Sequence, residues 1–204
     1  MAVNSYNGSL NADLYILTTE LIDYDSYETS YYYYTDFEPV LIVPRDSLTI
    51  SGALLYTDNG DKILVEDGVY CENVNVNKEV ALRAINPTGW SAGIEPTTPS
   101  LPTVSINANN VSLVGFKIAN GSVGVKVSGQ YCVAESNVIT NNTIGVLLHN
   151  ANNTVRSNYI TGNNIGIKLE SPPTATALID VFVYNNILSN GYYNETTGVG
   201  VESV

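Results

Sequence analysis

Histidine, methionine and tryptophan each occur only once in the 204-residue chain, and only 8 residues are basic. Against 20 acidic residues, this gives a formal net charge of −12. The deficit argues against a nucleic-acid binder, which needs basic patches to displace counterions from phosphates. It argues equally against binding to an anionic membrane. No run of 18 apolar residues is present, so the sequence predicts no membrane-spanning helix.

Cysteine is also scarce, since Cys71 and Cys132 are too few for a disulfide scaffold or a cysteine zinc site. The first residues, Met1 to Tyr6, lack the charged and apolar regions of a signal peptide. Either a signal has been removed or the protein is intracellular. Secretion is favoured by six Asn-x-Ser/Thr sequons, which are candidates for N-glycosylation at Asn7, Asn110, Asn120, Asn141, Asn152 and Asn194.

The abundant residues point to β-structure. The chain contains 25 Asn and 15 Tyr, together with many Val, Ile and Thr, whereas helix-forming residues are few. With 44% hydrophobic residues it can bury a substantial core, so wholesale disorder is not expected. This composition favours an all-β repeat protein.

A repeat of about 21 residues dominates the second half of the chain. Gly124, Gly145 and Gly166 are 21 residues apart, each between two aliphatic residues. The same step aligns three apolar columns: Leu113/Ala134/Val155, Ile118/Ile139/Ile160 and Val127/Leu148/Leu169. A fourth copy, displaced by two insertions, contains Phe182, Asn185, Ile187 and Val199–Val201, and earlier coils contain Val104–Ile106 and Val74–Val76.

Such a short repeat cannot fold alone, because its apolar residues are covered only by the repeats on either side. We therefore expect aligned residues to stack about 4.8 Å apart, as neighbouring strands do in a sheet. The glycine column predicts a bend in each coil that a Cβ would obstruct. Asn137, Asn158 and Asn185 form a further column at a corner, where stacked amides bond to one another and to the turn backbone.

The segment Gly60–Val74, followed by Asn77, Lys78 and Leu82, resembles the opening coil of right-handed parallel β-helix proteins. The Asn-Asn-x-Gly-Ile sequence of Asn163–Ile167 looks like the same group. The resemblance is to pectin-lyase-like proteins and, more closely, to NosD-like repeat proteins of archaeal and bacterial surfaces. It implies a right-handed, single-stranded parallel β-helix over residues 47–204, with a short element near Ser47–Tyr56 capping the first coil.

Residues 1–46 are interpreted as a separate acidic, Tyr-rich, β-rich arm or cap. The first 60 residues hold 9 acidic residues but 1 basic residue, and 9 of the 15 tyrosines. An acidic cluster in this region could bind calcium between subunits, or could simply keep the arm solvated: Asp23, Asp25, Glu28, Asp36 and Glu38. Asp58–Asp61 resembles part of a calcium loop, although a turn explains it as well. Calcium is the only candidate metal ion, and no cofactor is predicted.

The outward columns predict no catalytic site, because no column collects the paired carboxylates that glycosidase chemistry needs. They do predict two ion pairs between successive coils, Glu135 with Arg156 and His149 with Glu170. Cys71 and Cys132 are expected about two coils apart, beyond disulfide range, with both thiols facing outward. The two cysteines are then predicted either to form intermolecular disulfides or to remain as unpaired thiols.

The last coil is predicted to present unpaired strand edges, which favour pairing with another chain. Three explanations of these edges are possible: the chain is truncated, a partner protein covers the edges, or identical subunits stack on them. The residues expected at an assembly interface are Tyr31, Tyr32, Tyr33, Tyr34, Val199 and Val201. We predict a self-assembling, extracellular cell-envelope protein, a surface-layer, sheath or fibre subunit resembling archaeal surface proteins. The alternative is a β-helix that binds or cleaves carbohydrate, such as a surface polysaccharide, with the loop around Trp90 and the Tyr192–Tyr193 insertion as stacking candidates.

Overall fold

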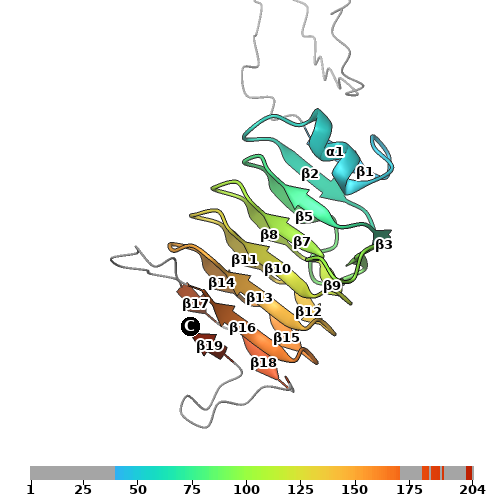
Figure 1. Ribbon diagram of the computed structural model, residues 1–204. Coiled ribbons are helices and arrows are strands. Elements are labelled where there is room, and N and C mark those ends of the chain that lie inside the picture. The colour runs from blue at the N-terminus through green and yellow to red at the C-terminus, as the bar shows by residue number, and fades with distance from the viewer. Residues whose placement is uncertain (1–39, 171–180, 184, 189, 191–200, 204) are drawn as a thin grey trace, which may run out of the picture.

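The computed structural model describes residues 40–170, 181–183, 185–188, 190 and 201–203. In these residues the chain winds into a parallel β-solenoid of six coils, with three sheets running along its sides (Figure 1). Successive coils lie next to one another along the axis, from β2 near the single short helix to β17, β18 and β19 at the other end. The predicted all-β parallel β-helix is confirmed.

Each of the six coils contributes one strand to each sheet, and β1 adds a seventh strand to sheet 1. Sheet 1 contains β1 (Val40–Val43), β2 (Lys62–Val65), β5 (Ala81–Ala84), β8 (Ser112–Val114), β11 (Val133–Glu135), β14 (Thr154–Arg156) and β17 (Val181–Val183). Sheet 2 contains β3 (Gly68–Cys71), β6 (Ala92–Glu95), β9 (Lys117–Ala119), β12 (Val138–Thr140), β15 (Tyr159–Thr161) and β18 (Asn186–Leu188). Sheet 3 contains β4 (Val74–Val76), β7 (Val104–Ile106), β10 (Val123–Val127), β13 (Ile144–Leu148), β16 (Ile165–Leu169) and β19 (Val201–Ser203).

The strand register confirms the 21-residue columns. Val123 pairs with Ile144, which pairs with Ile165, so the three glycines that follow them stand in one line. The upstream and displaced copies are also placed as predicted, since Val104 pairs with Val125 and Ile167 with Val201.

The core is a set of apolar ladders inside the coil. Sheet 2 supplies Ile94, Ile118, Ile139 and Ile160, and each of these side chains is fully buried. Sheets 1 and 3 supply similar ladders of Leu, Val and Ile, so each coil covers the apolar side chains of the next. No coil has a core of its own, which explains why the repeat folds only as a stack.

The glycine column is required by close packing between coils. A Cβ on Gly124 would lie 2.7 Å from the carbonyl oxygen of Gly145, and one on Gly145 would lie 2.5 Å from that of Gly166. These distances are too short for any side chain. The predicted steric obstruction is therefore confirmed. The predicted bend is wrong, because the glycines lie within strands β10, β13 and β16, where the close approach of the next coil excludes a Cβ.

Helix α1 (Ile50–Tyr56) covers the first coil and contacts β1, β2 and β4, where the capping element was expected. Thr49 is its N-cap and accepts a hydrogen bond from Gly52 N–H at 2.9 Å. The carboxylate of Glu72 accepts from Ile50 N–H at 2.9 Å and Ser51 N–H at 2.8 Å, so an anion faces the positive end of the helix.

The boundary between arm and solenoid lies earlier than predicted. Val40–Val43, which the sequence assigned to the arm of residues 1–46, forms β1 and pairs in parallel with β2. Residues 1–39, which contain most of the predicted arm and its acidic cluster, lie outside the described residues.

Candidate functional site

The corners between sheets share one local design. At every corner from β7–β8 to β15–β16, here called the regular corners, a residue with left-handed backbone is followed directly by a buried residue. The left-handed residues at regular corners with positive φ are Asn110, Gly115, Asn120, Tyr131, Ser136, Asn141, Asn152, Ser157 and Gly162. Glycine and asparagine adopt this conformation most readily, which accounts for part of the asparagine content.

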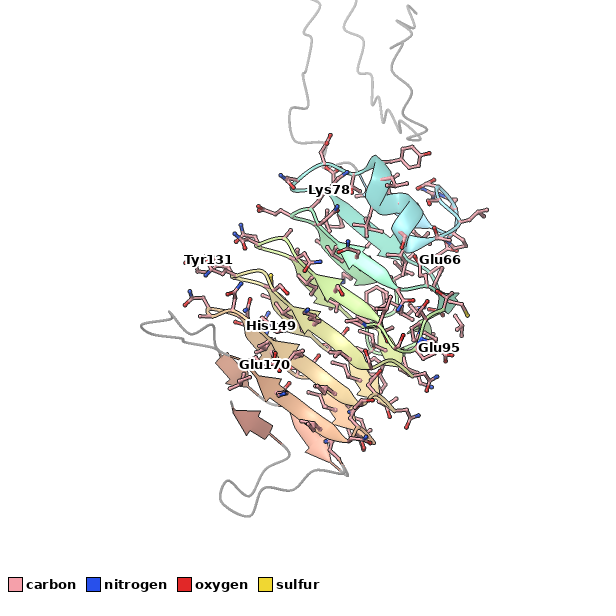
Figure 2. All side chains as sticks on the ribbon, viewed as in Figure 1. Glu66, Lys78, Glu95, Tyr131, His149 and Glu170 are labelled. Atoms are coloured by element: carbon pink, nitrogen blue, oxygen red, sulfur yellow. The ribbon has the colours of Figure 1, made fainter. Side chains whose placement is uncertain are left out.

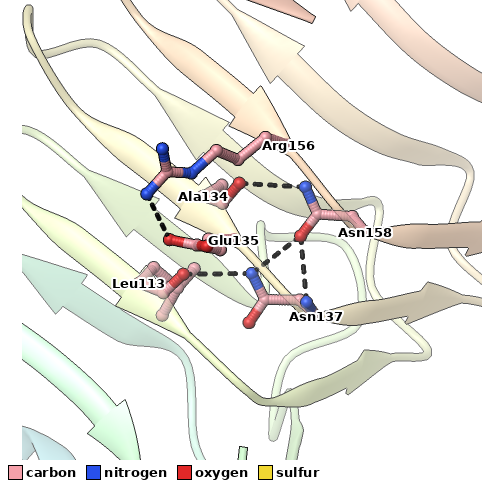
Figure 3. A network of polar contacts seen from close by, with 6 residues as sticks. All are labelled: Leu113, Ala134, Glu135, Asn137, Arg156 and Asn158. Carbon is pink, nitrogen blue, oxygen red and sulfur yellow. Dashed lines mark hydrogen bonds and ion pairs between the residues drawn. The ribbon is translucent and has the colours of Figure 1, made fainter. Parts of the chain in front are cut away.

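The inward residue that follows is often asparagine, and these asparagines form the predicted ladder between sheets 1 and 2. Oδ1 of Asn158 accepts from both N–H and Nδ2 of Asn137, each at 3.0 Å (Figure 3). Nδ2 of Asn158 donates to Ala134 O at 2.9 Å and to Oδ1 of Asn185 at 3.1 Å. Asn137 and Asn158 are nearly fully buried, so these bonds replace water completely. The ladder is structural, as predicted.

A second ladder, which sequence reasoning missed, lies at the corner between sheets 2 and 3. Oδ1 of Asn163 accepts from Asn142 N–H at 2.9 Å, and Oδ1 of Asn190 accepts from Asn163 N–H at 3.0 Å. Asn142 and Asn163 are 21 residues apart, so the spacing already contained the signal. At the third corner Asn153 makes the same type of bond to Cys132 N–H, at 3.0 Å.

Four of the six predicted sequons begin at left-handed corner residues. Asn110, Asn120 and Asn141 are exposed and Asn152 is half-buried, with φ between 55° and 67°. Nδ2 of Asn110 donates to Oε2 of Glu79 at 3.1 Å. An N-linked sugar replaces one amide hydrogen and leaves the other, so this bond and a glycan are compatible. Asn7 and Asn194 lie outside the described residues.

Both predicted ion pairs between coils are present on the outer faces. Nη2 of Arg156 lies 2.7 Å from Oε2 of Glu135, and Nε2 of His149 lies 3.4 Å from Oε2 of Glu170 (Figures 2 and 3). Lys168 Nζ also contacts Glu170, at 2.8 Å. That hydrogen bond lowers the pKa of Glu170, partial burial opposes it, and the charges of Lys168 and His149 add to the lowering.

The two cysteines differ in exposure. Cys71 is exposed at the end of β3, as predicted, but Cys132 is buried, so the prediction of an outward thiol is wrong there. Cys132 occupies the inward corner position held by Val111 one coil earlier and by Asn153 one coil later. Burial raises the pKa of the Cys132 thiol. An intermolecular disulfide through Cys71 stays a prediction.

Asp58–Asp61 forms a turn. Oδ2 of Asp61 accepts from Asp58 N–H at 2.7 Å, Oδ1 of Asn59 accepts from Glu79 N–H at 3.0 Å, and Gly60 has φ of 96°. Within the described ranges, no three His, Cys, Asp or Glu residues gather into a group able to hold a metal ion. Calcium binding by the acidic cluster of residues 23–38 stays a prediction, because those residues lie outside the described part.

Trp90 is held by a contact that the sequence did not predict. Its Nε1 donates to Ser136 O at 2.8 Å, across 46 residues of sequence, while 41% of the residue remains exposed. The loop between β5 and β6 thus lies along the corner over Gly115, where a Cβ would come 2.4 Å from Pro87 Cα. Trp90 anchors the loop and still presents a ring surface to solvent.

The predicted assembly residues mostly lie outside the described residues. This applies to Tyr31–Tyr34, to Val199 and to the Tyr192–Tyr193 insertion. Val201 is the first residue of β19, the outermost described strand of sheet 3. Three large apolar residues at the α1 end, here called the cap patch, are strongly exposed: Leu48 at 83%, Leu55 at 77% and Tyr56 at 73%.

The fold and its surface define a parallel β-solenoid whose corners carry sequons. No family model matches the chain. A stretch of 86 residues, 41% of this chain, is 36% identical to a protein of Methanothermus fervidus named cell surface glycoprotein. The match spans only 14% of the length of that relative. Over the described residues, no helix has the length and apolar character needed to cross a bilayer.

Proposed function

We propose that the chain is a structural, self-associating β-helix at the outer surface of a cell, a subunit of a surface layer, sheath or fibre. The observation that carries the proposal is the match to a protein named cell surface glycoprotein. The exposed sequon asparagines at the corners support it, because glycosylation occurs at surface Asn-x-Ser/Thr sites.

The proposal assigns the chain no catalytic role. Glu135 at the end of β11 and Glu170 directly after β16 each pair with basic residues rather than with a second carboxylate. Glycoside hydrolysis by the usual route needs two carboxylates on either side of the scissile bond. The ladders and ion pairs instead make the sides of the solenoid a scaffold.

The two ends of the solenoid support self-association. Each of β17, β18 and β19 has a described partner strand on one side only, and a strand edge is a template for pairing with another chain. At the other end the cap patch exposes three large apolar side chains, and patches of this kind mark interaction sites. Two different ends that meet head to tail generate filaments rather than closed dimers.

Electron microscopy and light scattering of the purified chain test this proposal. Filaments or sheets, and a particle mass far above the 22.0 kDa of one chain, are expected. Leu55→Glu should weaken assembly because it puts a charge into the cap patch. Lys117→Glu is the matched control, since Lys117 is exposed on β9, an inner strand of sheet 2 that is flanked by β6 and β12. Monodisperse monomers across a wide concentration range would refute the proposal.

Carbohydrate binding is the second candidate function, and the exposed ring of Trp90 favours it. The hydrogen bond to Ser136 fixes the indole, and a fixed aromatic ring offers a stacking surface at small entropic cost. Trp90→Ala should abolish binding to any oligosaccharide that the native chain retains in a glycan panel, including polyuronates with and without calcium. Tyr159→Thr, which alters an exposed ring on sheet 2, should not. A panel without binding removes this candidate.

A further inference from the structure

Tyr131 stands between two sequon asparagines on one corner of the solenoid. Asn110, Tyr131 and Asn152 are each 21 residues apart, and each precedes by two residues a strand of sheet 1. The paired register of β8, β11 and β14 places them on successive coils, about 4.8 Å apart. The backbone links these coils directly, because Asn110 N–H donates to Gln130 O at 2.9 Å.

The conformation of Tyr131 is unfavourable and its burial does not compensate for it. Its φ of 58° lies in the left-handed region, where bulky side chains are rare. The other regular corner positions with this conformation hold only Asn, Ser and Gly. Tyr131 is 60% exposed and lies at the outer margin of the solenoid (Figure 2). Strain that packing does not explain points to a role for the side chain.

The two neighbouring sequons are oriented for modification. In Asn110-Val111-Ser112 and Asn152-Asn153-Thr154 the middle residue is buried, at 1% exposure in both, whereas the preceding asparagine is exposed at 110 and half-buried at 152. Asn110 is exposed, and its bond to Glu79 fixes the direction of its amide. A sugar attached to either asparagine begins one coil away from the tyrosine ring.

We propose that Tyr131 is a docking platform for an N-linked glycan carried by Asn110 or Asn152. The ring face packs against the apolar C–H face of the first sugar residue, and the phenol hydroxyl is available to its polar groups. The contact orders the glycan along the corner. Its free energy offsets the cost of holding Tyr131 in the left-handed backbone conformation. This inference rests on the surface location in the proposed function.

The test measures how much glycosylation raises the melting temperature. The full chain is produced in a host that makes N-glycans and in one that does not, with occupancy at each sequon determined by peptide mass mapping. The native chain should melt at a higher temperature when glycosylated. Tyr131→Asn should lose this increment, while its unglycosylated form melts at the same temperature as native protein or higher, because asparagine suits the left-handed corner. Tyr131→Phe should keep the increment.

Controls identify the glycan and separate the outcomes. Ser112→Ala removes the sequon at Asn110 without touching its bond to Glu79, Thr154→Val removes the sequon at Asn152, and one of them should abolish the increment. Tyr159→Thr, which alters an exposed ring without creating a sequon, should leave the increment intact. No occupancy at either sequon, or an increment that persists in Tyr131→Asn, would overturn the inference. Occupancy is read by peptide mass mapping and does not depend on assembly. Melting is compared at one chain concentration, because assembly itself raises the melting temperature.

Discussion

Replacing Asn158 with alanine isolates one rung of the ladder between sheets 1 and 2. The side chain of Asn158 accepts two hydrogen bonds from Asn137 and donates one each to Ala134 O and Asn185. Each such bond contributes about 0.5–1.5 kcal/mol net, so the loss of four is worth about 4 kcal/mol. The buried N–H and Nδ2 of Asn137 would also lose their acceptor in the ladder, and this unsatisfied donor pair adds to the loss of unfolding free energy.

The assay is urea unfolding followed by circular dichroism, with stability taken from the midpoint at constant slope. Asn164→Ala is the matched control, because Asn164 is an exposed neighbour of the second ladder and surface changes usually stay within about 0.5 kcal/mol. If Asn158→Ala costs no more than this control, the claim that the ladder stabilises the coil stack is refuted.

A near-isosteric change separates hydrogen bonding from packing at the same site. In Asn158→Asp a carboxylate oxygen replaces the amide nitrogen and faces two acceptors, Ala134 O and Asn185 Oδ1. The pKa of the new carboxyl should therefore be raised in the folded protein. A raised pKa favours the folded state at acidic pH and opposes it as the pH rises through the folded value. The difference in unfolding free energy between Asn158→Asp and native protein should therefore shrink on acidification. A difference that stays constant with pH would indicate lost packing alone.

Three further predictions concern other parts of the solenoid. Gly145→Ala places a Cβ 2.5 Å from a carbonyl oxygen of the next coil and should cost about 2–3 kcal/mol in urea unfolding, as overpacking does; an unchanged midpoint would contradict the packing argument. The hydrogen bond from Lys168 lowers the pKa of Glu170, so its stabilisation is present at neutral pH and is lost as the pH falls through the folded value, below the ordinary 4.5. The melting temperature of Glu170→Gln should fall less on acidification than that of native protein. If both melting temperatures fall equally with pH, the contact between Lys168 and Glu170 does not stabilise the fold. A thiol reagent should label exposed Cys71 in the native chain and buried Cys132 only on unfolding, so equal labelling rates would show the burial to be wrong.

The sequence predicts the middle of the solenoid well because one spacing repeats there without interruption. Gly124, Gly145 and Gly166 share a step, and a residue that recurs at a constant step in a coil must lie above its predecessor. Near the start this step fails. Val40 pairs with Lys62 and Lys62 with Ala81, offsets of 22 and 19 residues. Column arithmetic could not assign β1 to the sheet for this reason.

The side-chain details at the corners were less predictable. Cys132 follows a left-handed residue and therefore turns inward, but nothing in its own chemistry distinguishes an inward thiol from an outward one. The contact of Trp90 with Ser136 depends on the path of a loop that belongs to no column. The second asparagine ladder could have been predicted from the sequence, because Asn142 and Asn163 have the same 21-residue spacing as the first ladder.

The ladders have a consequence for how such a chain changes length during evolution. An inner rung such as Asn158 bonds only to the coil before it and the coil after it. Duplicating or deleting one whole 21-residue unit therefore leaves every remaining rung with the same kinds of neighbour. Each added unit lengthens the molecule by about 4.8 Å, the spacing of adjacent strands. Unequal recombination can therefore change the length of the solenoid in small steps, because an added unit needs no core of its own.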